Sequence, residues 1–239
     1  MQFLNDPLYT RSGSDEDLKN LESLFSDKLG FTVTSRSNLT YQEIMKEVEA
    51  FAGKEEHGEA DMAAVVVMSH GREGAVCCSD GSMLETDWIL KQLNNSWCPR
   101  LRGKPKLFIF QSCRGEGEDP GATVTDSQLT VPSWGDMLIA YSTIPGNYSY
   151  RNEAKGSWFV QSLSTVFKEH AETYEIREML DDVSSRLSKY QTERGMKQSF
   201  NYEIWPPFKK FYFFPETGNA GSIRGKILVF TARSLRPWK

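Results

Sequence analysis

The chain lacks the features that would place it in a membrane, outside the cell or around a metal ion. It has no run of 18 apolar residues and no apolar N-terminal segment typical of a signal peptide. Its four cysteines include no C-x-x-C pair, and its three histidines show no zinc-ligand spacing. We therefore expect a cytoplasmic protein without a metal or other cofactor and without a membrane partner.

An excess of positive charge is also missing. The formal net charge of 239 residues is −4, which argues weakly against a nucleic-acid partner because phosphate binding needs a basic surface. The hydrophobic share of 39% and the charged share of 25% are ordinary for a folded chain. The length suffices for one sizeable core.

The pattern of helices and strands predicts an α/β fold. Capping-box patterns at Ser14–Asp17 and Thr40–Glu43 predict helix starts, and the second helix is expected to run through Phe51. Apolar periodicity predicts three more helices, at Trp88–Leu93, Ser157–Lys168 and Tyr174–Tyr190. Continuous apolar or β-prone runs predict five strands, at Phe31–Ser35, Met62–Ser69, Lys106–Phe110, Asp136–Ser142 and Lys209–Phe214. Strands that alternate with helices indicate a mostly parallel sheet.

Two stretches do not fit this alternation. Gly115–Ser133 has no periodicity and is interpreted as a surface loop. The last 24 residues carry five basic side chains against one acid, and their short "ILVF" run has no obvious partner. We expect this tail to lie outside the fold.

Two reactive side chains follow predicted strands. His70 comes after Met62–Ser69, and Cys113 comes after Lys106–Phe110. Ligands of open α/β sheets bind beyond the carboxyl ends of the strands. A cysteine nucleophile needs an imidazole to take its proton and backbone N–H groups to stabilise an oxyanion. Taken alone, however, a cysteine at a strand end is more often a small buried hydrophobe, and we keep that interpretation for Cys77, Cys78 and Cys98.

The segments around these two residues resemble the caspase family. "QSCRGE" is similar to the family's Q-A-C-R-G motif, which follows a histidine by about 50 residues, and His70 precedes Cys113 by about 43. "MSHGREG" resembles the family's histidine loop. Further segments match in family order over residues 3–215, closest to the effector branch: Thr10–Asp17, Gly103–Cys113, Ala140–Asn152 and Gly156–Leu163.

The resemblance implies a three-layer α/β/α fold with a six-stranded sheet. The family's strand order is 2-1-3-4-5-6, its last strand is antiparallel, and that last strand builds the dimer interface. The implied regions are a large-subunit part at 1–126, a small-subunit part at 127–215 and a divergent tail at 216–239.

The resemblance also implies a chemistry. The chain would be a cysteine endopeptidase that cleaves after aspartate, made as a zymogen and acting in apoptosis or related signalling. Cys113 would be the nucleophile and His70 the general acid/base, and the amides of Gly71 and Cys113 would form the oxyanion hole. Protein substrates and a homodimer of processed units would be the partners.

The same resemblance assigns the substrate pocket. Arg11 and Arg151 match the two arginines that neutralise the substrate aspartate, which suits the bidentate geometry of guanidinium and carboxylate. Gln111 matches their supporting amide. The other residues assigned to substrate binding are Tyr148, Ser149, Tyr150 and Trp158; Tyr150 stands where effector caspases usually have tryptophan.

The chain departs from the family at four places. Only the end of the family's interior first strand remains before Thr10, which would leave backbone groups of its neighbours unpaired. We expect no prodomain before the family match. Asp126 is the best processing site in a short linker, ahead of Asp119, which Pro120 follows. Ser199–Phe208 replaces the usual segment before the last strand.

Two other functions were weighed, of which the first stays open and the second is discounted. The first is a weakly active or inactive caspase homologue that regulates an active caspase by binding. The second is an α/β phosphate binder, which is discounted because no glycine-rich strand-to-helix loop is present.

Overall fold

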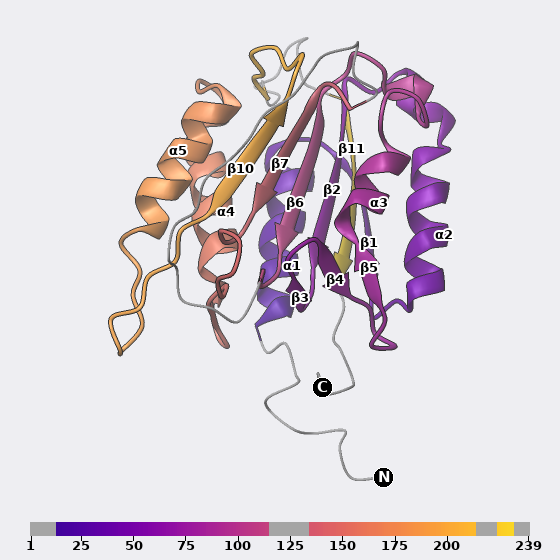
Figure 1. Ribbon diagram of the computed structural model, residues 1–239. Coiled ribbons are helices and arrows are strands. Elements are labelled where there is room, and N and C mark those ends of the chain that lie inside the picture. The colour runs from indigo at the N-terminus through magenta and orange to yellow at the C-terminus, as the bar shows by residue number, and fades with distance from the viewer. Residues whose placement is uncertain (1–12, 115–133, 214–223, 232–239) are drawn as a thin grey trace.

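A six-stranded sheet with helices on both faces forms the molecule (Figure 1). The computed structural model describes residues 13–114, 134–213 and 224–231. The strand order is β1-β11-β2-β6-β7-β10, in which β10 is antiparallel to β7 and the other neighbours are parallel. The strands are β1 (Thr32–Ser37), β2 (Met62–Met68), β6 (Lys106–Gln111), β7 (Met137–Tyr141), β10 (Asn201–Trp205) and β11 (Gly225–Thr231). The predicted three-layer α/β fold is confirmed.

The helices cover the two faces of the sheet in separate groups. One group is α1 (Ser14–Glu22) with its continuation η1 (Ser23–Lys28), α4 (Trp158–His170) and α5 (Ile176–Leu187). The other is α2 (Tyr41–Ala52) and α3 (Thr86–Gln92). The short elements are 3₁₀ turns at Glu55–Gly58 and Pro99–Leu101, strands β3 (Gly71–Arg72), β4 (Ala75–Cys77) and β5 (Met83–Glu85), and the pair β8 (Arg151–Asn152) and β9 (Gly156–Ser157).

Strand β2 shows why the apolar runs became central strands. All seven of its residues are buried. Successive side chains alternate between faces, so Ala64 and Val66 join the core under α1, α4 and α5, whereas Val65 and Val67 join the core under α2 and α3. A strand buried on both faces has no polar side, and this explains the continuous run in the sequence.

One of the two predicted capping boxes is confirmed and the other is wrong. Thr40 and Glu43 cap α2 reciprocally, as their spacing predicts. Helix α1 begins at Ser14 after Gly13, and no side chain caps it. Asp17 is instead fully buried, and its Oδ1 accepts a hydrogen bond of 2.7 Å from the amide of Ser157. The carboxylate that the local pattern assigned to the helix end therefore accepts a hydrogen bond from a segment far away in the sequence.

The C-terminal segment is not outside the fold, and that expectation is wrong. β11 lies between β1 and β2 and is parallel to both (Figure 1). Its side chains divide between the two cores, Ile227 and Val229 on one face and Leu228 and Phe230 on the other. The sheet position that would have left neighbouring backbone groups unpaired is therefore filled from the far end of the sequence.

The predicted last strand at Lys209–Phe214 is also wrong. The antiparallel strand is β10, which lies inside the Ser199–Phe208 segment. Residues 209–213 have no regular structure. Phe211 and Phe213 are buried, and the amide of Ile176 donates to the carbonyl of Phe211 (2.9 Å) at the start of α5. The aromatic run packs into the core beside a helix and does not extend the sheet.

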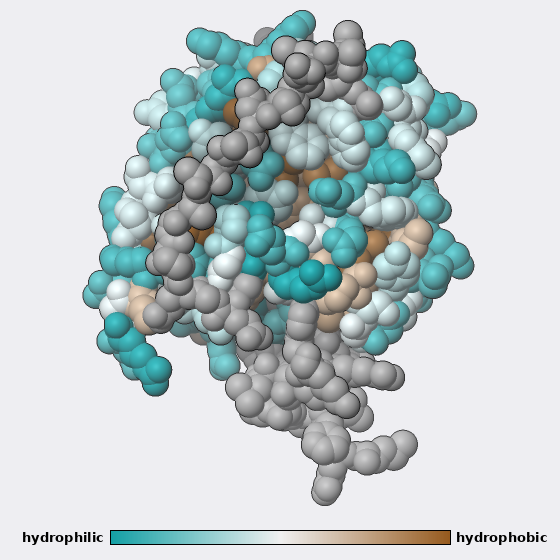
Figure 2. Space-filling model, viewed as in Figure 1, coloured by the Kyte–Doolittle hydropathy of each residue, from teal (hydrophilic) through white to brown (hydrophobic). Residues whose placement is uncertain are grey.

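The face of the molecule seen in Figure 2 is mostly polar where its residues are described. Figure 2 shows hydrophilic residues over most of the described surface of one face, with apolar residues in scattered hollows. No helix in the described ranges is both long enough and apolar enough to span a membrane. The same residues contain no group of three or more His, Cys, Asp or Glu side chains that could hold a metal ion.

Candidate active site

Strand register brings His70 and Cys113 to the same edge of the sheet. Met68 of β2 pairs with Gln111 of β6, and the amide of Ser69 donates to the carbonyl of Gln111 (3.1 Å). His70 and Cys113 each follow two residues after that pair. Adjacent strands lie about 4.8 Å apart, so the two residues that the sequence singled out follow neighbouring strand ends.

A short hairpin fixes the backbone at His70. The amide of Cys77 donates to the carbonyl of His70 (2.8 Å), and Gly71 pairs with Val76 across β3 and β4. A Cβ on Gly71 would lie 2.8 Å from the carbonyl oxygen of Ala75 and 3.0 Å from the Cβ of Ser112. Glycine is needed here because the histidine loop closely approaches the residue before Cys113.

The segment after Cys113 is attached to the loop that follows β7. The amide of Arg114 donates to the carbonyl of Asn147, and the amide of Gly146 donates to the carbonyl of Arg114, both at 3.1 Å. The guanidinium of Arg114 lies 4.1 Å from the ring centroid of Tyr141, a favourable cation–π contact. Cys113 is thus held between two strand ends.

Cys113 differs from the other cysteines in its environment. Its side chain is partly exposed, whereas Cys77, Cys78 and Cys98 are buried. Burial raises the pKa of Cys78 to about 12, with a further contribution from Asp80. Burial also raises the pKa of Cys98. Because the thiolate is the reactive form, Cys78 and Cys98 are poorly suited to nucleophilic chemistry.

Arg151 is a mostly buried cation near Cys113. Burial lowers the pKa of Arg151, while the negative charge of Asp17, and of Cys113 when its thiol is ionised, acts in the opposite direction. Asp17 also fixes the strand opposite Arg151, because Arg151 pairs with Ser157, whose amide donates to Asp17. A Cβ on Gly156 would collide with this carboxylate. Sequence reasoning missed Asp17 as part of the site because it assigned the residue to a helix cap.

Gln111 and Ser149 are brought together directly. The Nε2 of Gln111 donates to the Oγ of Ser149 at 2.8 Å. A second amide, from Gln198, reaches the same hydroxyl at 3.4 Å. Gln198 was not among the predicted site residues, since nothing in its local sequence marks it.

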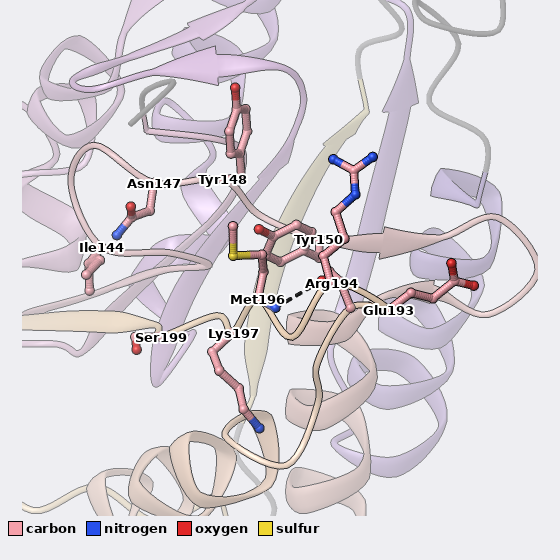
Figure 3. A pocket seen from close by; sticks show the side chains of 10 residues that line it. Ile144, Asn147, Tyr148, Tyr150, Glu193, Arg194, Met196, Lys197 and Ser199 are labelled. Atoms are coloured by element: carbon pink, nitrogen blue, oxygen red, sulfur yellow. Dashed lines mark hydrogen bonds between the residues drawn. The ribbon is translucent and has the colours of Figure 1, made fainter. Parts of the chain in front are cut away.

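A cavity of about 880 Å³ lies beside these residues, between the loops at 144–150 and 192–199. Tyr148 and Tyr150 line it from one loop and Met196 from the other, and Figure 3 shows the ring of Tyr150 next to the side chain of Met196. Tyr148 is 45% exposed. Trp158 packs against Tyr150 in a tilted arrangement with ring centroids 5.0 Å apart, so it supports this wall.

Arg11, the expected second pocket arginine, and Asp126, the expected processing site, lie outside the described residues.

Comparison with known proteins identifies the family. Residues 4–212 match the family model of the caspase domain. The chain belongs to the caspase family. It is 37% identical to human caspase-14 over 212 residues, which cover 84% of this chain and 86% of that protein. It is also 37% identical to rabbit caspase-3, with coverage of 88% and 79%.

A solved caspase structure has the same fold. Caspase-1 from Spodoptera frugiperda is similar with a TM-score of 0.73 and 32% identity, over 81% of this chain and 80% of that one. The caspase match ends at residue 212, whereas β11 begins at Gly225. The central strand β11 therefore comes from sequence beyond the caspase match.

Proposed function

We propose that this caspase is an active cysteine endopeptidase that cleaves peptide bonds after aspartate. The observation that carries the proposal is the placement of His70 and Cys113 on paired strand ends, with the mostly buried Arg151 near the thiol. Family membership supports a cysteine protease, and the aspartate preference rests on the charge of the pocket.

In the proposed reaction the Sγ of Cys113 attacks the carbonyl carbon of the substrate while His70 takes the thiol proton. The amides of Gly71 and Cys113 hold the oxyanion, and each such donor contributes roughly 3 kcal/mol. His70 returns the proton to the leaving amine as the carbon–nitrogen bond breaks. Water then hydrolyses the thioester, which regenerates the thiol and releases the new carboxylate.

The proposed pocket explains the preference for aspartate. Arg151, with Arg11 as its expected second cation and Gln111 as the supporting amide, would neutralise the substrate carboxylate. An asparagine peptide has the same shape but no charge, so it would not neutralise the positive charge of the proposed pocket. Tyr148, Ser149, Tyr150 and Trp158 are proposed to hold or support the residues before the aspartate.

Processing and dimerisation belong to the same proposal. A cut after Asp126 would separate the large-subunit region at 1–126 from a piece that holds the small-subunit region at 127–215 and the tail at 216–239. Among the strands that the structure describes, β10 pairs with β7 alone. Its outer backbone groups suit pairing with β10 of a second copy. A role in apoptosis or related signalling, and action in the cytoplasm, follow from the same family argument.

Paired peptides test the proposal. The intact chain and the chain cut after residue 126 are assayed with peptides that differ only in aspartate or asparagine before the scissile bond. We expect cleavage of the aspartate peptide alone, and none by the Cys113→Ala variant. If neither the intact nor the cut form of a folded protein cleaves either peptide, catalysis is contradicted and a homologue that acts by binding is favoured. Equal cleavage of both peptides would contradict the pocket.

A further inference from the structure

Gln198 occupies a central position in the hydrogen bonding around the site. It lies in the connection between α5 and β10 and is only 3% exposed. Neither the proposed chemistry nor the proposed pocket uses this side chain. A buried amide that satisfies both its donor and its acceptor groups holds its partners in one arrangement.

The amide of Gln198 joins two parts of the site. Its Oε1 accepts from the backbone amide of Tyr150 at 2.7 Å, and its Nε2 donates to the carbonyl of Ser142 at 2.6 Å. The partners settle the orientation of the amide, since the Tyr150 N–H must meet the oxygen. Tyr150 directly precedes Arg151, and Ser142 follows the end of β7.

These bonds continue to the segment that carries the nucleophile. The Oγ of Ser142 accepts from the amide of Ser112 (3.2 Å) and donates to its carbonyl (3.0 Å). On the other side, the Oγ of Ser149 accepts from both Gln198 and Gln111. Gln111 and Ser112 are consecutive and lie just before Cys113. The hydrogen bonds and the chain segments that join these residues therefore form a closed ring through Gln198, Ser142 and Ser149.

We infer that Gln198 is a positioning residue, which sets the backbone of Ser149–Arg151 at a defined place relative to Cys113. The inference rests on the proposed function, because positioning has an effect on rate only if a peptide binds along this segment. Gln198 touches no reacting atom. Its loss is expected to weaken substrate binding, and so to raise KM more than it lowers kcat.

Two variants separate positioning from simple packing. Gln198→Met keeps the size of the side chain and removes both hydrogen bonds. Gln198→Glu accepts from Tyr150 in either protonation state, but it can donate to Ser142 only when protonated. Gln191→Glu is the matched control, since Gln191 is an exposed glutamine in the same connection.

The pH profile is the main readout. Relative to wild type at each pH, we expect Gln198→Glu to lose at least about tenfold in kcat/KM at pH 7.5, because a buried carbonyl loses its donor. The deficit should shrink as the pH falls towards 5.5. Gln198→Met should show a deficit that does not depend on pH, and Gln191→Glu should match wild type. Parallel deficits of Gln198→Met and Gln198→Glu at every pH would overturn the inference.

Two measurements do not depend on proteolysis. Hydrogen exchange at the Tyr150 amide should be faster in Gln198→Met than in wild type or Gln191→Glu, and alkylation of Cys113 by iodoacetamide should be unchanged. If wild type fails to cut the aspartate peptide, the proposed function fails while the exchange data still judge the placement of Tyr150. Unchanged exchange, or loss of folding in both Gln198 variants, would show that Gln198 does not act by positioning.

Discussion

At the scale of single residues, the environment of a side chain decides its chemistry more than its type does. Cys113 and Cys98 are both cysteines of one sheet-based domain, but only Cys113 is partly exposed at the carboxyl edge of the strands. Asp17 matched a helix-cap pattern, although burial against Ser157 makes it a support for the strand opposite Arg151.

We predict that iodoacetamide modifies the native protein at Cys113 first. Thiolate is the reacting form, and burial protects Cys77, Cys78 and Cys98, with the pKa of Cys78 raised to about 12. Mass spectrometry of digests should show close to one modification per chain under native conditions. All four cysteines should react in denaturant, and Cys113→Ala should lose the native reaction. Early native labelling at Cys98 would contradict the described burial.

At the scale of elements, β11 is the least expected part of the fold. It comes from sequence beyond the caspase match, yet it lies between two strands inside that match. Its hydrogen bonds with β1 and β2 close a gap that would otherwise expose two rows of backbone groups. Because β2 leads to His70, the placement of β11 also supports the candidate site.

We predict that Gly225→Ala destabilises the protein although it adds a single methyl group. A Cβ at Gly225 would collide with the ring of Phe31, which is itself held between Phe25 and Phe213. Overpacking of this kind costs about 1–3 kcal/mol in free energy of unfolding. Denaturant unfolding monitored by circular dichroism measures the loss.

Gly58→Ala is the matched control for that substitution. Nothing lies within 4 Å of a Cβ at Gly58, so its stability should equal or slightly exceed that of wild type. Equal stabilities of both variants would show that β11 does not occupy the described position. Hydrogen exchange provides a second check, since the amides of residues 226–230 should be as protected as those of β2.

At the scale of the whole molecule, two cores on opposite faces of one sheet account for stability. Both contain side chains of β11, from the C-terminal end of the described chain, so neither core is complete until β11 is in place. The core under α2 also adjoins a buried titratable group. His57 is fully buried, and its Nε2 donates to the carbonyl of Phe51 (2.7 Å).

The burial of His57 predicts how the free energy of unfolding depends on pH. Burial lowers the pKa of His57, opposed in part by the hydrogen bond to Phe51. The unfolded state therefore binds more protons as the pH falls below about 6.5, and stability is lost by at most about 1.4 kcal/mol per pH unit. Between pH 7.5 and 5.5, wild type should lose more free energy of unfolding than His57→Gln.

The control for this measurement is His170→Gln. His170 is partly exposed and stacks on Tyr174. Its substitution should leave the pH-dependent loss seen in wild type unchanged. If His57→Gln and wild type lose equal stability over this range, the ionisation of His57 does not contribute.

Much of the architecture could be predicted because it depends on local pattern. Continuous apolar runs located β2, β6 and β7 to within one or two residues, and the Thr40–Glu43 spacing located the start of α2. Because His70 and Cys113 each follow a predicted strand of a parallel sheet, they were expected at one edge of that sheet, where the carboxyl ends of the strands lie. Their roles remain a proposal that the peptide assay tests.

Local pattern in the sequence predicts the helices, the central strands β2, β6 and β7, the family, and the two reactive side chains at one sheet edge. Only the tertiary structure decided that Val229 belongs to a central strand, that Asn201–Trp205 and not Lys209–Phe214 is the antiparallel strand, and that Gln198 joins Ser142 to Tyr150. The physical reason is the same in each case. Periodicity indicates which side chains of a helix or strand are buried. Strand order and the partners of a buried amide depend on residues that come together only after the chain has folded.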